Sequence, residues 1–266
     1  FSSKDPNVQN IPVRGGRGAE VRRAFVAAPG FRLLALDYSQ IEFRILAILS
    51  KDKDLIRIFN EGIDVHTAVA SRVFGVSESE VTKDMRRRAK VINFGIIFGM
   101  GVSSLQRTLG GTREEAQALY DNYFNKFPGV AEYLRNIPRE AARKGYTETL
   151  FGRRRYIHGL SSPIPYIKNA ALRMAVNAPI QGTATGDIIK LAIVKADTML
   201  REQGLHDSAF LLLQIHDELM YEVKEDALLS AARSIKESME HVFVDAVPLL
   251  VEVSEGKNWG ELKKLL

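Results

Sequence analysis

The feature that most constrains the fold is a short apolar run that ends in an acid. The four apolar residues 33–36 are followed at once by Asp37 and then by Tyr38-Ser39-Gln40. An apolar run bounded by polar residues predicts a buried strand, although so short a run is also compatible with a helix segment. From Ile41 onward, apolar residues recur at helical spacing, so a helix is expected to begin just after the acid.

An acid at a strand-to-helix junction has a rigid support and an open side. Such a position suits a hard cation or a phosphate complex. A single aspartate in this place can equally act as a helix cap. Both interpretations of Asp37 stay open on this stretch alone.

The composition is that of an ordinary globular protein, with 266 residues of which 45% are hydrophobic and 26% charged. This length allows one large domain or two modest ones. Cysteine is absent, which excludes disulfides and thiolate metal sites. No signal peptide is recognisable and no apolar stretch approaches the roughly 18 residues of a spanning helix, so no membrane partner is expected. The net charge of +5 is compatible with a polyanionic partner.

Turn residues and periodicity predict the order of the elements. Several breaker residues make residues 1–23 extended and loop-like, and two strands are expected at 24–27 and 33–36 about Pro29-Gly30. Helical periodicity then dominates from 41 to about 59. Further helices are expected at 64–74, 85–100, 112–127, 129–144 and, with an interruption near Pro179 and Gly182, 168–201.

The helix at 85–100 carries two cations in line with aromatic rings. Arg86, Lys90 and Phe94 recur every four residues and Phe98 continues the row, so these side chains lie near one side of the helix. Arginine grips phosphate at two points, lysine adds a point charge and an aromatic face stacks on a base. This face suits a ligand with a phosphate tail and a flat base. A partly buried helix with snorkelling cations is the alternative.

Two other sets of polar helix residues give weaker signals. His66 lies beside apolar positions, where a lone histidine is more often structural than functional. Arg173, Asn177 and Gln181 are four residues apart, and they form either simple surface or a polar row that faces a groove.

A second acidic feature lies between two apolar segments of residues 209–223. These segments flank His216-Asp217-Glu218 and predict a hairpin with carboxylates at its tip. Adjacent acids are costly to bury without a cation or hydrogen bonds. Together with Asp37 they can hold two divalent metals, since Mg²⁺ and Mn²⁺ prefer oxygen ligands, and two such ions serve phosphoryl transfer. An exposed turn whose acids meet only water is the alternative.

Six motifs occur together along the chain. Three of them are Asp37-Tyr38-Ser39-Gln40-Ile41-Glu42, the helix pattern Arg86-x3-Lys90-x3-Phe94-Gly95, and His216-Asp217-Glu218. Their order and type resemble the three polymerase motifs of the bacterial DNA polymerase I family (family A). The similarity extends to residues 5–14, 149–155 and 177–184, so it spans essentially the whole chain. One such motif is weak evidence, but six in register are highly specific.

The resemblance implies an α+β right-hand polymerase fold. An antiparallel-sheet palm would occupy residues 1–60 and 166–266, and a mostly helical fingers subdomain with a nucleotide-binding helix at 84–99 would be inserted at 61–165. In the family, the thumb and any exonuclease domain lie before the motif near Asp5. The thumb would therefore be absent from this chain and is expected upstream in the same polymerase or as a separate chain. The chain alone is expected to hold duplex DNA weakly.

The resemblance also implies an activity, which is template-directed DNA synthesis. A dNMP would be added to a primer 3′-OH with release of pyrophosphate, with two Mg²⁺ ions as cofactors and Mn²⁺ as a substitute. The partners would be primer-template DNA and dNTPs. The expected location is the bacterial cytoplasm or nucleoid, with an organelle or a phage as alternative sources.

The family motifs assign roles to individual residues. The catalytic residues would be Asp37, Asp217, Glu218 and Lys90, with Asp37, Asp217 and the Tyr38 carbonyl as metal ligands. The residues that bind the nucleotide would be Gln40, Glu42, His66, Arg86, Lys90, Phe94 and Phe98. Glu42 would disfavour ribonucleotides. The residues that contact primer, template or the nascent pair would be Arg14, Arg173, Asn177, Gln181 and His216, of which Arg14 and Gln181 would meet minor-groove acceptors that all correct pairs share.

One departure and two alternatives accompany this interpretation. The family usually has Tyr where this chain has Phe98, which cannot donate a hydrogen bond to Glu42. A metal-dependent nuclease can use the same carboxylates but has no need of the Arg86–Lys90–Phe94 face. A catalytically idle nucleic-acid-binding module would account for basic clusters such as residues 153–155, but it would not need Asp37 and Asp217.

Overall fold

A computed structural model describes residues 5, 7–12 and 16–266, which form two compact units. The first unit contains the described residues of Phe1–Ile41 together with Thr185–Val244 and Leu249–Leu266. The second contains Glu42–Ala184 and Asp245–Pro248. None of the helices in the described residues combines the length and apolar content that crossing a bilayer requires.

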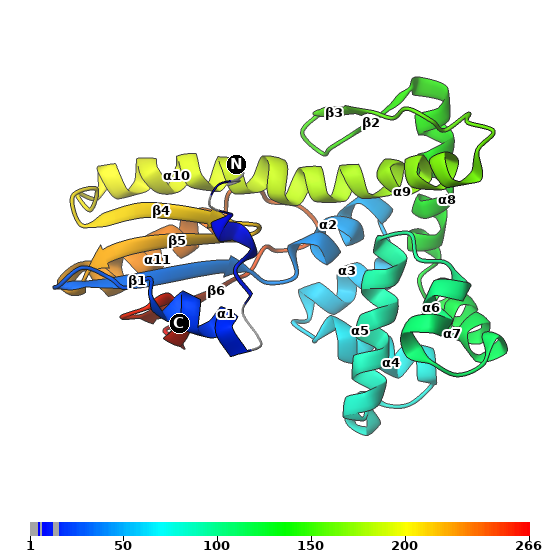
Figure 1. Cartoon of the computed structure of the whole chain (residues 1–266), viewed down its shortest axis with the longest axis horizontal. Helices are drawn as coiled ribbons and strands as arrows, with labels where there is room; N and C mark the ends of the chain where they lie inside the picture. The colour runs from blue at the N-terminus through cyan, green and yellow to red at the C-terminus, as the bar shows by residue number, and fades with distance from the viewer. Residues whose placement is uncertain (1–4, 6, 13–15) are drawn as a thin grey trace. The chain divides into compact units, whose positions relative to one another are not determined.

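The first unit is built on an antiparallel sheet. Within the described residues this sheet has five strands in the order β4-β5-β1-β6-β7, and Figure 1 shows β4, β5 and β1 side by side. The strands are β1 (Phe31–Tyr38), β4 (Ala209–Ile215), β5 (Glu218–Lys224), β6 (Val251–Gly256) and β7 (Lys263–Lys264). The strand predicted at 33–36 is the centre of β1, and the predicted acidic hairpin is β4–β5. The α+β class is thereby confirmed.

Side chains alternate along β1, so the sheet has two different faces. Tyr38 points to the face covered by α11 (Leu228–Glu240), where its hydroxyl donates to the Met239 carbonyl at 2.7 Å, and α10 (Ile189–Glu202) packs against α11. The opposite face carries a buried apolar cluster of Leu33, Ala35, Ile215, Met220 and Trp259. Asp37 shares this second face, since it follows Leu33 and Ala35 in steps of two.

The second unit is mostly helical. Its helices are α2 (Ile41–Ser50, of which Ile41 belongs to the first unit), α3 (Lys53–Asn60), α4 (Val65–Phe74), α5 (Lys83–Ile97), α6 (Val102–Leu109), α7 (Arg113–Lys126), α8 (Pro128–Lys144) and α9 (Pro165–Gln181). A small hairpin of β2 (Tyr146–Glu148) and β3 (Arg154–Tyr156) precedes α9. Side-chain oxygens of Asp52, Asp64, Thr82 and Thr112 accept from backbone N–H groups in the first turns of α3, α4, α5 and α7. These caps satisfy donors that have no partner within the helix and so fix where each helix begins.

Three expectations about the elements are wrong. The chain is not loop-like as far as residue 23, because α1 (Gly16–Arg23) is a helix that packs near the 3₁₀ turn η5 (Trp259–Glu261). The strand expected at 24–27 is reduced to a single bridge between Val26 and Asn258. The helix expected from 41 to 59 is broken, since Lys51 has φ 51° and Asp52 caps α3 while accepting from Gly129 N–H at 2.9 Å.

The interruption predicted near Pro179 and Gly182 is confirmed. A π-helical stretch, η3 (Gly182–Ile188), connects α9 with α10. The Thr183 hydroxyl donates to the Pro179 carbonyl at 2.6 Å. π-Helical turns within α-helices occur frequently at functional sites.

Candidate active site

The three acids predicted from the sequence adjoin one another at one end of the sheet in the first unit. Asp37 of β1 is paired in register with Glu218 of β5 on one side and with Glu252 of β6 on the other. The Tyr38 N–H donates to the Asp217 carbonyl at 3.2 Å. Directly opposed residues in an antiparallel pair have Cβ atoms about 4.5–5.5 Å apart. The fold therefore brings Asp37, Asp217 and Glu218 together, and the cap interpretation of Asp37 is wrong because it lies within β1.

This crowding disfavours the charged forms of the acids. Burial, followed by the charges of Asp217, Glu218 and Glu252, raises the pKa of Asp37 to about 7, although one side of the residue stays open to solvent. Burial raises the pKa of Glu218 to about 7, with Arg22 opposing the shift and Asp217 adding to it. Burial also raises the pKa of Asp217, although its own backbone N–H and His216 oppose the shift. Because the acids repel one another when ionised, a cation placed among them is strongly favoured.

The chemistry of these acids fits a hard divalent cation. The Glu218 Oε1 atom is buried and has no hydrogen-bond partner among the described residues. Among all the residues that the structure describes, no group of three or more His, Cys, Asp or Glu side chains lies close enough together to hold a metal by itself. Mg²⁺ is commonly held by one or two carboxylates completed by substrate phosphates and water. The acids are therefore suited to an ion that the substrate helps to bind.

The turns that carry these acids hold two residues in an unfavourable backbone conformation. Gln40, two residues after β1, and His216, between β4 and β5, both have φ 54°. Non-glycine residues in this left-handed region cost of order 1–3 kcal/mol and cluster at functional sites. The side chain of Tyr38 points away from the acids, so only its backbone is available to a ligand on their side.

The second unit presents the predicted cationic face on α5. Arg86 and Lys90 are exposed, and the Lys90 Nζ lies 5.8 Å from the centroid of the Phe94 ring. Arg86 donates from Nε and Nη2 to the two carboxylate oxygens of Asp64 at 3.0 and 2.9 Å. Burial tends to raise the pKa of Asp64, but hydrogen bonds from Arg86 and Thr67 outweigh it and lower the pKa to about 2.

His66 lies behind this face and is buried. Its Nδ1 atom is 3.1 Å from Asn93 Nδ2, and since an amide nitrogen only donates, Nδ1 accepts and the ring proton is on Nε2. Burial lowers the pKa of His66 to about 4, with Asp64 opposing the shift and Arg86 and Lys90 adding to it. The imidazole is therefore neutral at pH 7 and can offer a phosphate only its Nε2–H.

Aromatic rings form the remainder of the α5 face. The Phe94 ring lies edge-on to Phe43 at 4.9 Å and almost parallel to Phe98 at 6.4 Å, with 10° between the planes. Phe98 is the C-cap of α5 and its ring is partly open to solvent, with 36% of the residue exposed. Glu42, at the start of α2, is half-buried.

The polar row on α9 meets the C-terminal end of α5. The Arg173 side chain lies so close to Gly99 that a Cβ on Gly99 would be 2.7 Å from Arg173 Cγ. The amide oxygen of Asn177 is buried without a hydrogen-bond partner among the described residues, and Gln181 ends α9. A cavity of about 490 Å³ opens beside this contact, lined among others by Met100, Tyr120, Phe124 and Arg173. Arg14 lies outside the described residues.

Several residues of the site carried no signal in the sequence. Asp64 holds Arg86 from another helix, Asn93 holds His66, and Phe43 supports Phe94. These contacts join positions 22 to 51 residues apart, which no local pattern relates. Glu252 was detectable in principle, because it lies in the alternating sequence Val251-Glu252-Val253-Ser254.

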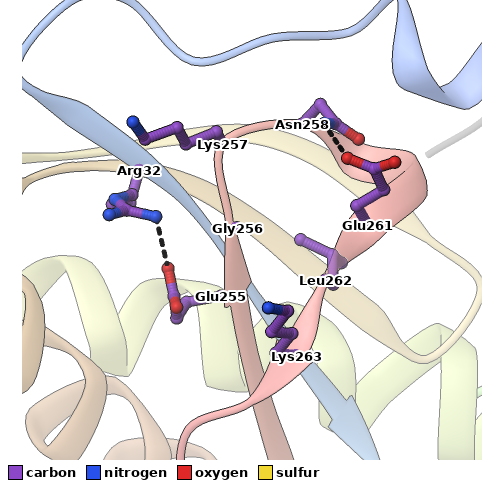
Figure 2. A pocket seen from close by; sticks show the side chains of 8 residues that line it. All are labelled: Arg32, Glu255, Gly256, Lys257, Asn258, Glu261, Leu262 and Lys263. Carbon is purple, nitrogen blue, oxygen red and sulfur yellow. Dashed lines mark hydrogen bonds and ion pairs between the residues drawn. The ribbon is translucent and has the colours of Figure 1, made fainter.

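A separate cleft of about 610 Å³ lies at the other end of β1 (Figure 2). Among its lining residues, Arg32 donates to Glu255 at 3.4 Å and Asn258 donates to Glu261 at 2.9 Å. Asp37, Asp217 and Glu218 do not line this cleft.

Adjoining carboxylates on a sheet, together with a helix that aligns Arg and Lys with aromatic rings, are typical of phosphoryl-transfer enzymes. The family profile described as DNA polymerase family A matches residues 1–261. The chain belongs to this family, and the resemblance found in its motifs is confirmed.

Similar proteins support the assignment over nearly the whole chain. The sequence is 50% identical to "DNA polymerase I, thermostable" of Thermus aquaticus over 264 residues, which cover 99% of this chain and 31% of that protein. It is 48% identical to DNA polymerase I of Pseudomonas aeruginosa over 98% of this chain and 28% of that protein. The solved POL domain of Pol1 from M. smegmatis, in complex with DNA primer-template and dNTP, matches with TM-score 0.92 and 43% identity, covering 97% of this chain and 45% of that one. The chain therefore spans about a third of the length of these curated relatives.

Proposed function

We propose that the chain carries the polymerising activity of a DNA-directed DNA polymerase, which adds dNMP units to a primer 3′-OH with release of pyrophosphate. The observation that carries this proposal is the adjacency of Asp37 and Asp217 within a chain whose family match runs over residues 1–261. The named relatives are DNA polymerases I, and the M. smegmatis structure contains primer-template and dNTP. Primer-template DNA and dNTPs are therefore the proposed partners, in the bacterial cytoplasm or nucleoid.

In this proposal the first unit is the palm and the second is the fingers. The first unit contains the sheet with the acids, and the second contains α3 to α9 and all of α2 except Ile41. The predicted boundaries near residues 60 and 165 stay predictions. So does the location of a thumb on another segment or chain.

Asp37 and Asp217 are the proposed ligands of two Mg²⁺ ions, with Mn²⁺ as a substitute, and the Tyr38 carbonyl is a proposed third ligand. When bound, these ions make the primer 3′-OH more nucleophilic and stabilise the charge on the leaving pyrophosphate. Glu218 adds negative charge beside Asp217 and helps to orient the water or phosphate oxygens that complete the site. The rigid pairing of β1 with β5 holds the acids at a fixed spacing, so little reorganisation is needed during the reaction.

The α5 face is the proposed binding site for the nucleotide. Arg86 and Lys90 would hold the triphosphate, with Lys90 nearest to the leaving group, and His66 would donate its Nε2–H to a phosphate oxygen. Phe94 would pack on the sugar and base, while Gln40 and Glu42 would line the sugar. Phe98 would stack beside the templating base.

The α9 row and the β4–β5 turn are the proposed contacts with DNA. Arg173, Asn177, Gln181 and His216 would contact primer, template or the nascent pair. Arg14 is proposed on the resemblance alone. Hydrogen bonds from such residues to minor-groove acceptors test the shape of a pair without reading its sequence.

A labelled primer annealed to a longer template tests the proposal directly. The chain, Mg²⁺ and dNTPs should lengthen the primer as the template directs, whereas Asp37→Ala and Asp217→Ala should abolish extension with the fold intact by circular dichroism. Shortening of the primer would instead identify a nuclease. Metal-independent binding without turnover would identify a binding module. Near-normal extension by either variant would reject the metal assignment.

A further inference from the structure

Arg22 is fixed at two points on the sheet face that carries the acids. Its guanidinium carbon lies 3.9 Å from the centroid of the Trp259 ring, and its Nε and Nη2 atoms donate to the Ile11 carbonyl at 3.1 and 2.9 Å. Trp259 is 4% exposed, and its Nε1 has no hydrogen-bond partner among the described residues. Its ring therefore acts as an apolar platform for the cation.

The platform is continuous with the strands that carry the acids. Trp259 belongs to the buried cluster that includes Ala35 and Met220, each two residues from an acid, and Ile11 packs on its edge. Residues two apart in a strand share a face, so Asp37 and Glu218 lie on the same face as this cluster. Glu218 and Arg22 are close enough for each to shift the other's pKa, Glu218 raising that of Arg22 against a larger lowering by burial.

The segment held by Arg22 also reaches the turn that presents Asp217. Gln9, two residues before Ile11, donates from Nε2 to the Gln214 carbonyl at 2.9 Å. The Gln214 side chain in turn donates to the His216 carbonyl at 3.1 Å, and His216 is the residue with φ 54°. Contacts thus run from Trp259 through Arg22 to the segment Gln9–Ile11, and from this segment through Gln214 to the turn at His216.

We infer that Arg22 and Trp259 are positioning residues, which lock the segment of Gln9–Ile11 against β4 and thereby fix the turn that carries Asp217 relative to Asp37. The inference rests on the proposed metal-binding function of these acids. In this inference Arg22 binds neither the ion nor the reacting atoms. It acts through geometry, since only a planar guanidinium can stack on Trp259 while donating twice to one carbonyl.

Binding of Mn²⁺ alone to the chain, followed by the electron paramagnetic resonance of free Mn²⁺, tests the inference. Arg22→Lys keeps the charge but loses the paired hydrogen bonds and the stacked plane, and it should raise the Mn²⁺ dissociation constant about tenfold, as loss of outer-shell support does at other metal sites. Arg23→Lys is the matched control, because Arg23 has a side chain that is 58% exposed and is paired to Glu261 at 3.2 Å. This control should bind Mn²⁺ like the unmodified chain.

Two further variants separate positioning from charge and from folding. Arg22→Met removes the cation beside the acids. This variant should bind Mn²⁺ more tightly if Arg22 acts by charge, and more weakly if Arg22 positions the turn. Trp259→Leu should weaken Mn²⁺ binding as Arg22→Lys does. The double variant should bind Mn²⁺ no more weakly than either single variant, because both residues act through the same stacking contact. If Trp259→Leu does not fold, the comparison of Arg22→Lys with Arg23→Lys decides.

The outcomes distinguish this inference from the proposed function. Unchanged Mn²⁺ affinity in Arg22→Lys, or tighter binding in Arg22→Met, overturns the inference even if the melting temperature falls. Failure of the unmodified chain to bind Mn²⁺ overturns the proposed metal site, and the inference falls with it. In primer extension, Arg22→Lys should lower kcat about tenfold and leave the KM for dNTP unchanged, because the α5 face is untouched.

Discussion

Arg86 and Asp64 form a two-point ion pair, with both guanidinium-to-carboxylate distances at or below 3.0 Å. The same carboxylate caps α4 by accepting from Thr67 N–H at 2.8 Å. The first cation of the proposed nucleotide-binding face is thus already paired with an acid of the protein. In the proposed function, a triphosphate would have to compete with Asp64 for Arg86.

Asp64→Asn should therefore favour nucleotide binding. Asparagine keeps the helix cap but removes the charge that competes for Arg86. Exposed ion pairs are worth about 0.2–1 kcal/mol, so the KM for dNTP in primer extension should fall by up to about fivefold. Asp84→Asn is the control, since Asp84 pairs with Arg87 in an exposed i, i+3 contact on the same helix. A KM that is unchanged or higher in Asp64→Asn would show that Asp64 does not compete with the substrate.

Asp37→Asn should separate activity from stability. The carboxylate of Asp37 faces three other acids, and this repulsion, after burial, is what raises its pKa. Without metal at pH 8, the variant should melt a few degrees higher than the unmodified chain, while primer extension is lost. Glu255→Gln, at the opposite end of the sheet, removes one charge without relieving this group and serves as the control. A lower melting temperature in Asp37→Asn without metal would contradict the repulsion.

His66 should make the stability of the chain depend on pH between about 4 and 6.5. Burial lowers the pKa of His66 to about 4 in the folded state, whereas an exposed histidine titrates near 6.5. Between these values the unfolded chain binds more protons than the folded chain. The free energy of unfolding therefore increases as pH rises from about 4 to 6.5 and decreases as pH falls. The full effect is about 3 kcal/mol at most.

Urea unfolding at several pH values measures this dependence. His66→Gln should flatten the curve between pH 4 and 6.5, and His206→Gln, at an exposed histidine, should not. Asp64 adds a separate loss of stability below about pH 4, because its folded pKa of about 2 lies under that of an exposed aspartate. An unchanged slope in His66→Gln would mean that the ring is protonated in the folded chain.

The sequence predicts those parts of the site that follow from local patterns. The apolar run before Asp37, the strands around Asp217 and the four-residue spacing on α5 each correspond to an element in the structure. These patterns are strong because strand and helix periodicity depend on neighbouring residues only. The same dependence accounts for the errors at α1, whose helix is stabilised by packing near η5, a partner more than 230 residues away.

What local patterns cannot supply is the set of partners for each functional side chain. Nothing near Arg86 indicates Asp64, and nothing near Arg22 indicates Trp259. Such partners decide whether a cation is available to a substrate or acts as a support. The family resemblance supplied roles for residues, but the contacts in the structure are what distinguish Arg22 from Arg23, its neighbour in the sequence.

In the proposed function, Phe98 should affect how the chain selects the sugar of the nucleotide. Its ring is stacked on Phe94 and partly exposed, so the family's usual tyrosine hydroxyl would be accommodated without repacking. In the proposed function, Glu42 would have to exclude the ribose 2′-OH by sterics alone, because Phe98 cannot donate a hydrogen bond to it. A hydrogen bond to a charged group contributes about 1.5–3 kcal/mol when buried and less when exposed. Phe98→Tyr should therefore lower ribonucleotide insertion relative to deoxyribonucleotide insertion by about three- to tenfold.

The ratio of kcat/KM for the two nucleotides in single-nucleotide insertion measures this selection. Glu42→Ala should raise ribonucleotide insertion, and Phe98→Tyr added to Glu42→Ala should have no further effect, because the acceptor of the hydrogen bond is gone. Equal selection by the unmodified chain and Phe98→Tyr would reject the role of the missing hydroxyl. An effect of Phe98→Tyr that persists without Glu42 would instead point to stacking of the ring as the cause.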